Sequence, residues 1–249
     1  MNYAKLKAKT ASLDAGDLLW DGENPFSTNK VTGHSLNYPI GPTCAPTKVC
    51  VETCYFGRGP STWSAALKKQ HRLRNSTIAD PDGTAGRIAE WAGRLRLSFV
   101  RWNGGGDLFA EAVECLNVAA SLMPDTPQWV VTRLPQYAIN ILPRPNVYVH
   151  FSLDRSSWTR AAAMRPLKKL QWFWSYQCAP DEVPEHPVAP VVFRDCYDPR
   201  GDELNADDCP LNSAADISGV CESCRRCFNG NAVARAAELS GVLSSRIDA

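Results

Sequence analysis

The sequence predicts an α/β protein in which a partial (βα)6 TIM-like barrel is followed by a cysteine-rich C-terminal extension. Short apolar strands alternate with helical patterns from about residue 31 to about residue 195, which is typical of βα units on a parallel sheet. No G-x-G-x-x-G motif opens a helix after the first strand, so a dinucleotide-binding fold is not favoured. Six βα units can instead curl into part of a barrel.

Six runs of apolar, β-branched and aromatic residues are expected to form the strands. In chain order they cover about 31–38, 97–102, 128–132, 147–153, 170–175 and 191–194. The second run stops at a glycine-rich turn, and the last follows a proline-rich connection.

Apolar residues recur at helical spacing in the segments between these strands. The expected helices cover about 61–75, 84–95, 109–123, 134–141, 158–167 and 232–247. Ser61 stands at the start of the first helix, and we expect its hydroxyl to cap that helix.

The length of 249 residues suits one domain with an appendage. We expect an N-terminal segment over 1–30, a partial barrel with a three-cysteine loop over 31–200, and a cysteine-rich iron–sulfur extension with a terminal helix over 201–249. Hydrophobic residues make up 44% of the chain and charged residues 21%, so wholesale disorder is excluded.

Charge and hydropathy restrict the classes of partner. The formal net charge of +1 shows no basic excess, so nucleic acid is not expected as a partner. No apolar run approaches the ~18 residues of a membrane-spanning helix, so no membrane partner is expected. The N-terminus lacks the apolar stretch of a secretory signal, and we therefore expect a cytoplasmic protein.

The C-terminal cysteines carry the strongest motif in the sequence. Cys221, Cys224 and Cys227 form C-x2-C-x2-C, and Cys209 stands upstream before Pro210. This spacing is typical of a ferredoxin-type [4Fe–4S] cluster, whose remaining thiolate often precedes a proline. A structural zinc site is the alternative, although zinc usually takes two separated cysteine pairs, and unligated thiols are the third reading.

A second cysteine group lies in a loop near the N-terminus. Cys44, Cys50 and Cys54 form C-x5-C-x3-C among prolines and glycines. Three thiolates on a cubane leave one iron open, but a fourth ligand from Cys115, Cys178, Cys196 or a histidine would close it. Spacing alone therefore indicates a metal site without establishing an open iron, and three unconnected thiols remain the alternative.

The glycine run Gly104-Gly105-Gly106, followed by Asp107, comes at the end of the second expected strand. Because parallel strands end at one edge of a sheet, we expect this loop and the three-cysteine loop to share that edge. Three glycines exceed what one tight turn needs, which favours close approach of a ligand to the backbone. Asp107 either binds a cofactor amine or caps the next helix.

Other polar residues near the strands have two possible roles each. Arg133 and Arg194 follow strands and either face the barrel mouth, where they would pair with a substrate anion, or are solvated rim charges. His150 lies within a strand, and we expect it to be a hydrogen-bonded core histidine rather than a ligand.

The two loops together resemble the radical S-adenosylmethionine superfamily, in which a three-cysteine loop follows the first barrel strand and a Gly-Gly-Glu stretch follows the second. Gly105-Gly106-Asp107 matches that stretch, and the segment ending Ser152-Leu153-Asp154 resembles the family's fourth strand. The resemblance implies a [4Fe–4S] cluster on the first three cysteines and a possible S-adenosylmethionine cofactor. The residues it assigns to that cofactor are Gly104, Gly105, Gly106, Asp107 and Ser152.

The whole chain also resembles the bacteriophage gene-product-88 family. The matching features are Cys54-Tyr55, the stretch from Trp102 to Phe109, and the Cys221-x2-Cys224-x2-Cys227-Phe228 ending. This resemblance implies a phage source, and hence the host cytoplasm as location, but it implies no activity.

Three functions remain open at this point. The first is a radical S-adenosylmethionine-type enzyme with an auxiliary C-terminal cluster, a small-molecule or peptide substrate and an electron donor. The second is a non-catalytic iron–sulfur protein on the same fold, with a structural, redox-sensing or partner-binding role. The third is a zinc-stabilised interaction module. The sequence identifies neither a catalytic residue nor the substrate.

Overall fold

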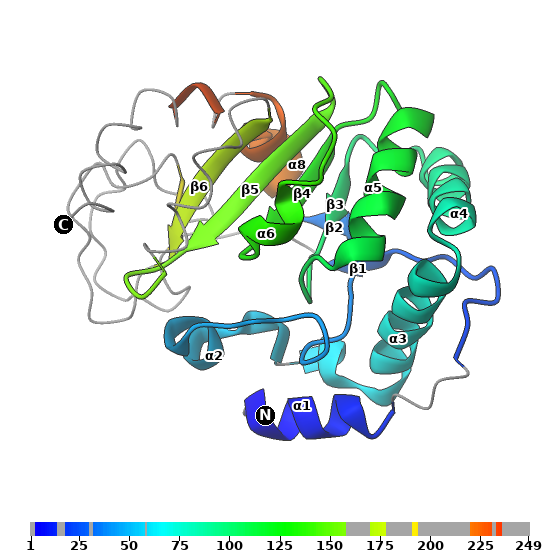
Figure 1. The fold of residues 1–249 in the computed structure, drawn as a ribbon, viewed down its shortest axis with the longest axis vertical. Helices are drawn as coiled ribbons and strands as arrows, with labels where there is room; N and C mark the ends of the chain where they lie inside the picture. Colours follow the sequence, from blue (N-terminus) through cyan, green and yellow to red (C-terminus); the bar gives the residue numbers. More distant parts are fainter. Residues whose placement is uncertain are drawn as a thin grey trace.

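The computed structural model describes residues 3–13, 18–29, 32–57, 59–157, 170–177, 191–193, 220–230 and 233–235. A seven-stranded sheet forms its centre, with the strands side by side in chain order (Figure 1). The strands are β1 (Ser27–Asn29), β2 (Gly33–Ser35), β3 (Val100–Trp102), β4 (Gln128–Thr132), β5 (Val147–Leu153), β6 (Gln171–Gln177) and β7 (Val191–Phe193). Each strand from β2 to β6 runs parallel to the next, and only β1 is antiparallel to its neighbour.

The predicted α/β class and parallel sheet are therefore confirmed. The sheet is not closed in the described residues, and its curling into a partial barrel stays a prediction. The bounds of β4 and β5 agree with the expected strands at 128–132 and 147–153, while β2 and β3 are shorter than expected. Both well-predicted strands are rich in β-branched and aromatic residues, which pack well on a pleated surface.

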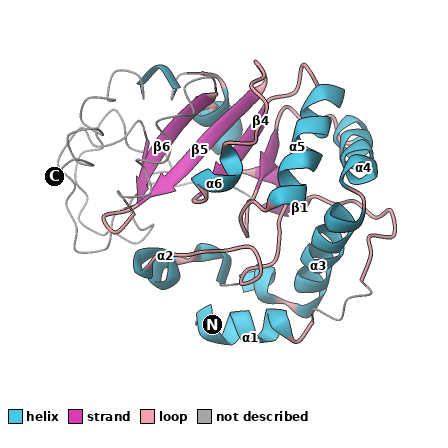
Figure 2. Cartoon of the chain, in the orientation of Figure 1, coloured by secondary structure: helices cyan, strands magenta, loops and turns pink. Residues whose placement is uncertain are grey.

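The described α-helices are α1 (Tyr3–Ala11), α2 (Lys48–Thr53), α3 (Ser64–Ala79), α4 (Pro81–Arg94), α5 (Ala110–Leu122), α6 (Pro135–Ala138) and α8 (Val220–Cys224). Short 3-10 helices cover Tyr55–Gly57, Gly59–Thr62 and Arg226–Phe228. Figure 2 shows α3, α4 and α5 together on one side of the sheet. The expected helix at 158–167 lies outside the described residues, as does the expected terminal helix apart from 233–235. No helix in the described ranges is long and apolar enough to span a membrane.

Two helix starts differ from the expectation, each for a local reason. Ser61 does not cap α3, because its hydroxyl donates to the carbonyl of Phe56 and the helix begins three residues later at Ser64. The next helix begins at Pro81 rather than near residue 84, because the Asp80 carboxylate caps it by accepting from the amide of Gly83.

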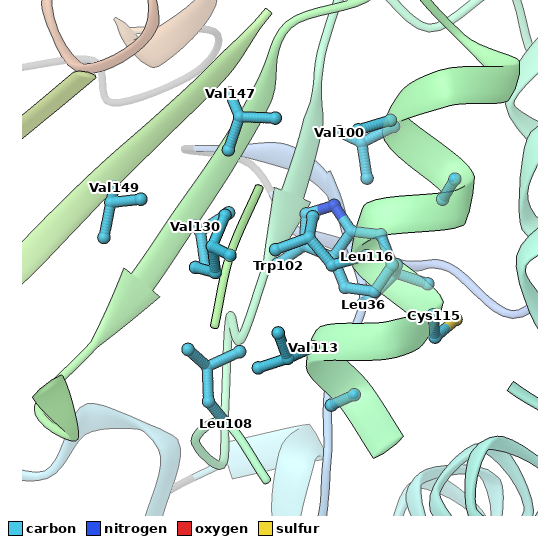
Figure 3. Packing of buried hydrophobic residues seen from close by; sticks show 14 of the residues in the cluster. Leu36, Val100, Trp102, Leu108, Val113, Cys115, Leu116, Val130, Val147 and Val149 are labelled. Carbon is cyan, nitrogen blue, oxygen red and sulfur yellow. The ribbon is translucent and has the colours of Figure 1, made fainter. Parts of the chain in front are cut away.

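The main core lies between the sheet and α5. Trp102 of β3 and Val130 of β4 point to this side with Leu116 of α5, and all three are fully buried (Figure 3). The indole N–H of Trp102 donates to the side-chain carbonyl of Gln128 at 2.8 Å. The indole N–H is the only polar group of the Trp102 side chain. Because it is hydrogen-bonded, the tryptophan can be buried in the core without an unsatisfied donor.

Candidate functional site

The three-cysteine loop lies at the carboxyl ends of the parallel strands. In Figure 1, α2 of this loop is near the arrowhead of β5, away from the end where that strand begins. The hydroxyl of Thr43, the residue before Cys44, accepts from the amide of Asp107 in the glycine loop at 3.0 Å. The two loops therefore share one edge of the sheet, as the sequence predicted.

The three glycines accommodate very close approaches by the chain's own atoms. A Cβ added at Gly105 would be 2.2 Å from a ring carbon of Phe56, and one at Gly104 would be 2.4 Å from the Asn37 side-chain oxygen. Gly106 has a φ of +78° and faces the carbonyl of Tyr38. The carbonyl of Gly105 accepts from the amide of Tyr38 at 2.9 Å. The absence of a side chain at Gly104 and Gly105 thus lets Asn37 and Phe56 pack directly against the glycine loop. Contact of the glycines with a ligand stays a prediction.

Asp107 is buried and fully engaged by hydrogen bonds. Its carboxylate accepts from the Thr132 hydroxyl at 2.6 Å, from the amide of Arg133 at 3.1 Å and from its neighbour Leu108 at 2.8 Å. The N-cap of α5 is Phe109, so the capping role considered for Asp107 is wrong. Burial raises the pKa of Asp107 to about 6, although these hydrogen bonds and the charge of Arg133 act in the opposite direction.

Arg133 forms a buried ion pair next to Asp107. One guanidinium nitrogen lies 2.8 Å from Asp154, and the other donates to Ser152 at 3.1 Å and to Gln177 at 2.7 Å. The side chains of Arg133 and Asp154 are 10% and 0% exposed, so the interpretation of Arg133 as a solvated rim charge is wrong. Its guanidinium instead joins the carboxyl ends of β4, β5 and β6.

Asp154 stays ionised beside Arg133. Burial alone would raise the pKa of this carboxyl, but hydrogen bonds from Ser156 and Thr47 and the charge of Arg133 hold it below its ordinary value. The bond from Thr47 is important for the site, because Thr47 lies between Cys44 and Cys50. It connects the three-cysteine loop to the end of β5.

The three thiols of the loop lie close enough to influence one another's charge. Burial raises the pKa of Cys44 to about 12, with Asp107, Cys50 and Cys54 adding to the shift. Burial also raises the pKa of Cys50, and Arg133 opposes that shift. Both thiols are therefore protonated at neutral pH unless a cation binds them.

The N-terminal helix α1 closes the opposite side of this loop. Burial, together with the three thiols, raises the pKa of Tyr3 to about 12. Leu6 packs in a small apolar cluster with Ile40 and Leu67, and Cys44 and Cys54 border the same cluster. The cysteine loop thus lies between the apolar side of helix α1, formed by Tyr3 and Leu6, and the polar strand ends.

The donor set of this loop fits an iron–sulfur cluster, because thiolates are the ligands that such clusters take. Within the described ranges, however, no three His, Cys, Asp or Glu side chains form a group that would hold a metal ion as they stand. Binding a cluster at Cys44, Cys50 and Cys54 therefore requires the three thiols to converge further.

One candidate for a fourth thiolate is excluded by its position. Cys115 is fully buried in the main core on α5, where Asp80, Asp82 and Arg87 are the charged groups that affect its pKa (Figure 3). It does not lie beside the three-cysteine loop. The other two candidates, Cys178 and Cys196, lie outside the described residues.

The C-terminal cysteines pack against the other face of the sheet. Cys221 and Cys227 border a cluster of Phe99, Trp129 and Phe228, which includes residues near the amino ends of β3 and β4. Trp129 points away from the main core, because neighbouring strand residues alternate between faces. Burial raises the pKa of Cys221, with Arg101 opposing and Cys224 adding to the shift. Cys209 lies outside the described residues, so the full predicted ligand set is not seen together.

Sequence reasoning missed several residues of this site. Thr43, Thr47, Asp154, Gln177 and Tyr3 contact or adjoin the cysteine loop or the Arg133 network, and none of them was assigned a role in advance. Only Thr47 had a usable local signal. Threonine is a common N-cap residue, and its hydroxyl accepts from the amide of Cys50, three residues later, in the first turn of α2. The others depend on contacts between distant parts of the chain.

Comparison with known proteins identifies one family. A family model described as Gene product 88 matches residues 3–230, which is most of the chain. No curated protein and no solved structure matches. The resemblance to the radical S-adenosylmethionine superfamily gains no support from these comparisons and stays a prediction. The resemblance to gene product 88 is confirmed, and the chain belongs to the Gene product 88 family.

Proposed function

We propose that this chain is an iron–sulfur protein that holds a [4Fe–4S] cluster on Cys44, Cys50 and Cys54. The observation that carries the proposal is the position of three neighbouring thiols, which influence one another's pKa, beside a buried arginine network at the carboxyl edge of a parallel sheet. In sheets of this kind, ligands and active sites lie at that edge. A second cluster on Cys209, Cys221, Cys224 and Cys227 is part of the same proposal.

The finer proposal is an enzyme of the radical S-adenosylmethionine type, built on a partial barrel and acting in the cytoplasm of a phage host. A cluster with S-adenosylmethionine bound supplies one-electron cleavage of a sulfonium bond, and an electron donor and a small-molecule or peptide substrate would be its partners. Two features support it: Cys115 is too far into the core to close the cluster, and Asp107 lies beside Cys44. The chain's own part would be to bind the cofactor at residues 104–107 and Ser152.

A non-catalytic iron–sulfur protein is the second candidate, and a specific observation favours it. The Gly105 carbonyl, the Asp107 carboxylate and the Ser152 hydroxyl, all assigned to the cofactor, already have hydrogen-bond partners within the chain. A cofactor would have to add to these bonds or replace them. A zinc-stabilised interaction module is the third candidate, and the identity of the bound metal distinguishes it from the other two.

Metal analysis of three proteins tests the proposal. After anaerobic purification and reconstitution with iron and sulfide, we expect the unmodified chain to hold about eight iron atoms, since it would carry two four-iron clusters. Cys50→Ala and Cys224→Ala should each reduce this to about four. Zinc without iron would refute the iron–sulfur proposal. Full iron in Cys50→Ala would refute the N-terminal cluster.

Adding S-adenosylmethionine to the dithionite-reduced protein separates the two iron–sulfur candidates. For the enzyme, we expect a changed electron paramagnetic resonance signal and release of 5′-deoxyadenosine, and both should be lost in Cys50→Ala. An unchanged signal and no nucleoside, from protein with a full N-terminal cluster, would instead support the non-catalytic candidate.

A further inference from the structure

We propose that the hydroxyl of Thr47 positions Cys50 and is itself anchored by the buried Arg133–Asp154 ion pair. The proposal concerns how the chain builds its three-cysteine loop, and it rests on the proposed function only in taking Cys50 as a ligand. Thr47 is a positioning residue in this account, since it acts on a bound group through Cys50.

The hydroxyl of Thr47 has two partners with opposite roles. It accepts from the backbone amide of Cys50 at 3.1 Å, which caps the first turn of α2. It also donates to a carboxylate oxygen of Asp154, 107 residues away in the chain. One oxygen therefore fixes the backbone at a cysteine and ties that cysteine to the sheet.

The anchor of this bond is rigid. Asp154 is fully buried and accepts from Arg133 at 2.8 Å on the same oxygen that binds Thr47. Arg133 follows β4 and is held in turn by Ser152 and Gln177, so the ends of β5 and β6 fix its guanidinium. A charged acceptor strengthens the hydrogen bond from Thr47, and a satisfied buried network holds one geometry.

A parallel connection holds the other end of the loop. Thr43, the residue before Cys44, accepts from the amide of Asp107 and donates to the carbonyl of Pro39. Asp107 accepts from the amide of Arg133, so both threonines lead to the same arginine. The loop is thus held on each side of Cys44, while the amide at Cys50 depends on Thr47. A metal-ligating side chain whose backbone is held by hydrogen bonds from neighbouring residues has a better-defined position than one on an unsupported loop.

Thr47→Val and Thr47→Ser form a matched pair for the test. Valine keeps the shape but removes both hydrogen bonds, whereas serine keeps the hydroxyl. The readout is the rate at which iodoacetamide alkylates each cysteine of the full-length, chelator-treated protein, followed by peptide mass spectrometry. We expect alkylation of Cys50 to be about fivefold faster in Thr47→Val, the factor that corresponds to losing a helix cap of about 1 kcal/mol. Thr47→Ser should stay within about twofold of the unmodified chain on the same scale.

Cys115 controls for general loosening of the fold, because it is fully buried in the main core. Its rate should not change in either variant. An unchanged Cys50 rate in Thr47→Val, or an equal increase at Cys50 and Cys115 in both variants, would overturn the proposal. If Thr47→Val does not fold, Thr47→Ala replaces it, since alanine also removes the hydroxyl and leaves the charges around Cys50 unchanged. The proposal then requires faster alkylation of Cys50 without a change at Cys115.

The alkylation experiment needs no cluster, so it separates this proposal from the proposed function. A fivefold effect at Cys50 in a chain that takes up no iron would uphold the positioning role and refute the cluster. A normal iron content with no effect of Thr47→Val on Cys50 alkylation would support the cluster and refute the positioning role of Thr47. With a cluster bound, the same substitution should also shift its electron paramagnetic resonance signal, and Thr47→Ser should restore that signal.

Discussion

Gly105→Ala is expected to lower the free energy of unfolding by about 3 kcal/mol, the upper part of the range for overpacking a dense site. The added methyl would lie 2.2 Å from the ring of Phe56, a distance that no pair of non-bonded carbon atoms can keep. The backbone cannot move away easily, because the Gly105 carbonyl accepts from the amide of Tyr38. The ring must therefore shift, and Phe56 is two residues from Cys54.

Urea unfolding followed by tryptophan fluorescence measures this loss. Gly86→Ala is the matched control: nothing lies within 4 Å of a Cβ at that position, which is inside helix α4. This change should raise stability by about 1 kcal/mol, since alanine is the better helix former. The double variant Gly105→Ala with Phe56→Leu should recover part of the loss. Equal stability of Gly105→Ala and the unmodified chain would contradict the contact between the two loops.

The part of the fold that follows from local pattern was predictable. The expected strands at 128–132 and 147–153 were confirmed with their bounds, because both are short runs rich in β-branched and aromatic residues that lie between turn-forming residues. Helix starts were less predictable, since a cap depends on which polar group is nearest in space. Ser61 looked like a cap and donates elsewhere, whereas Asp80 caps the helix that sequence reasoning started three residues too late.

The candidate site was predictable only in its outline. The rule that parallel strands end at one edge correctly brought the cysteine loop and the glycine loop together. The same rule could not tell what the glycines are for, because the atoms that fill the space above Gly104 and Gly105 come from Asn37 and Phe56. Nor could it pair Arg133 with Asp154, since two charges 21 residues apart in different loops have no local signature.

His150 was expected to be a hydrogen-bonded core histidine, and the structure confirms this. The residue is 2% exposed. Its Nδ1 accepts from the indole N–H of Trp129 at 3.1 Å, so the proton of the neutral ring is on Nε2, which lies 2.6 Å from the Ser175 hydroxyl. A second proton on Nδ1 would point at the indole N–H. Burial, with Arg101 and Arg133 nearby, lowers the pKa of His150 from 6.5 to about 3.

This lowered pKa predicts a specific loss of stability in acid. Below pH 6.5 the histidine takes up a proton in the unfolded chain but not in the folded one, so the contribution of His150 to stability is present above 6.5 and is lost as the pH falls toward 3. The slope for one proton is about 1.4 kcal/mol per pH unit. His150→Gln has no titrating group at this position, and its profile should be shallower by that amount between these limits. Urea unfolding of both proteins at a series of pH values measures the difference in slope, which does not depend on how far glutamine itself lowers stability. Parallel profiles for the two proteins would show that His150 is protonated in the folded state, and would contradict the hydrogen bond from Trp129.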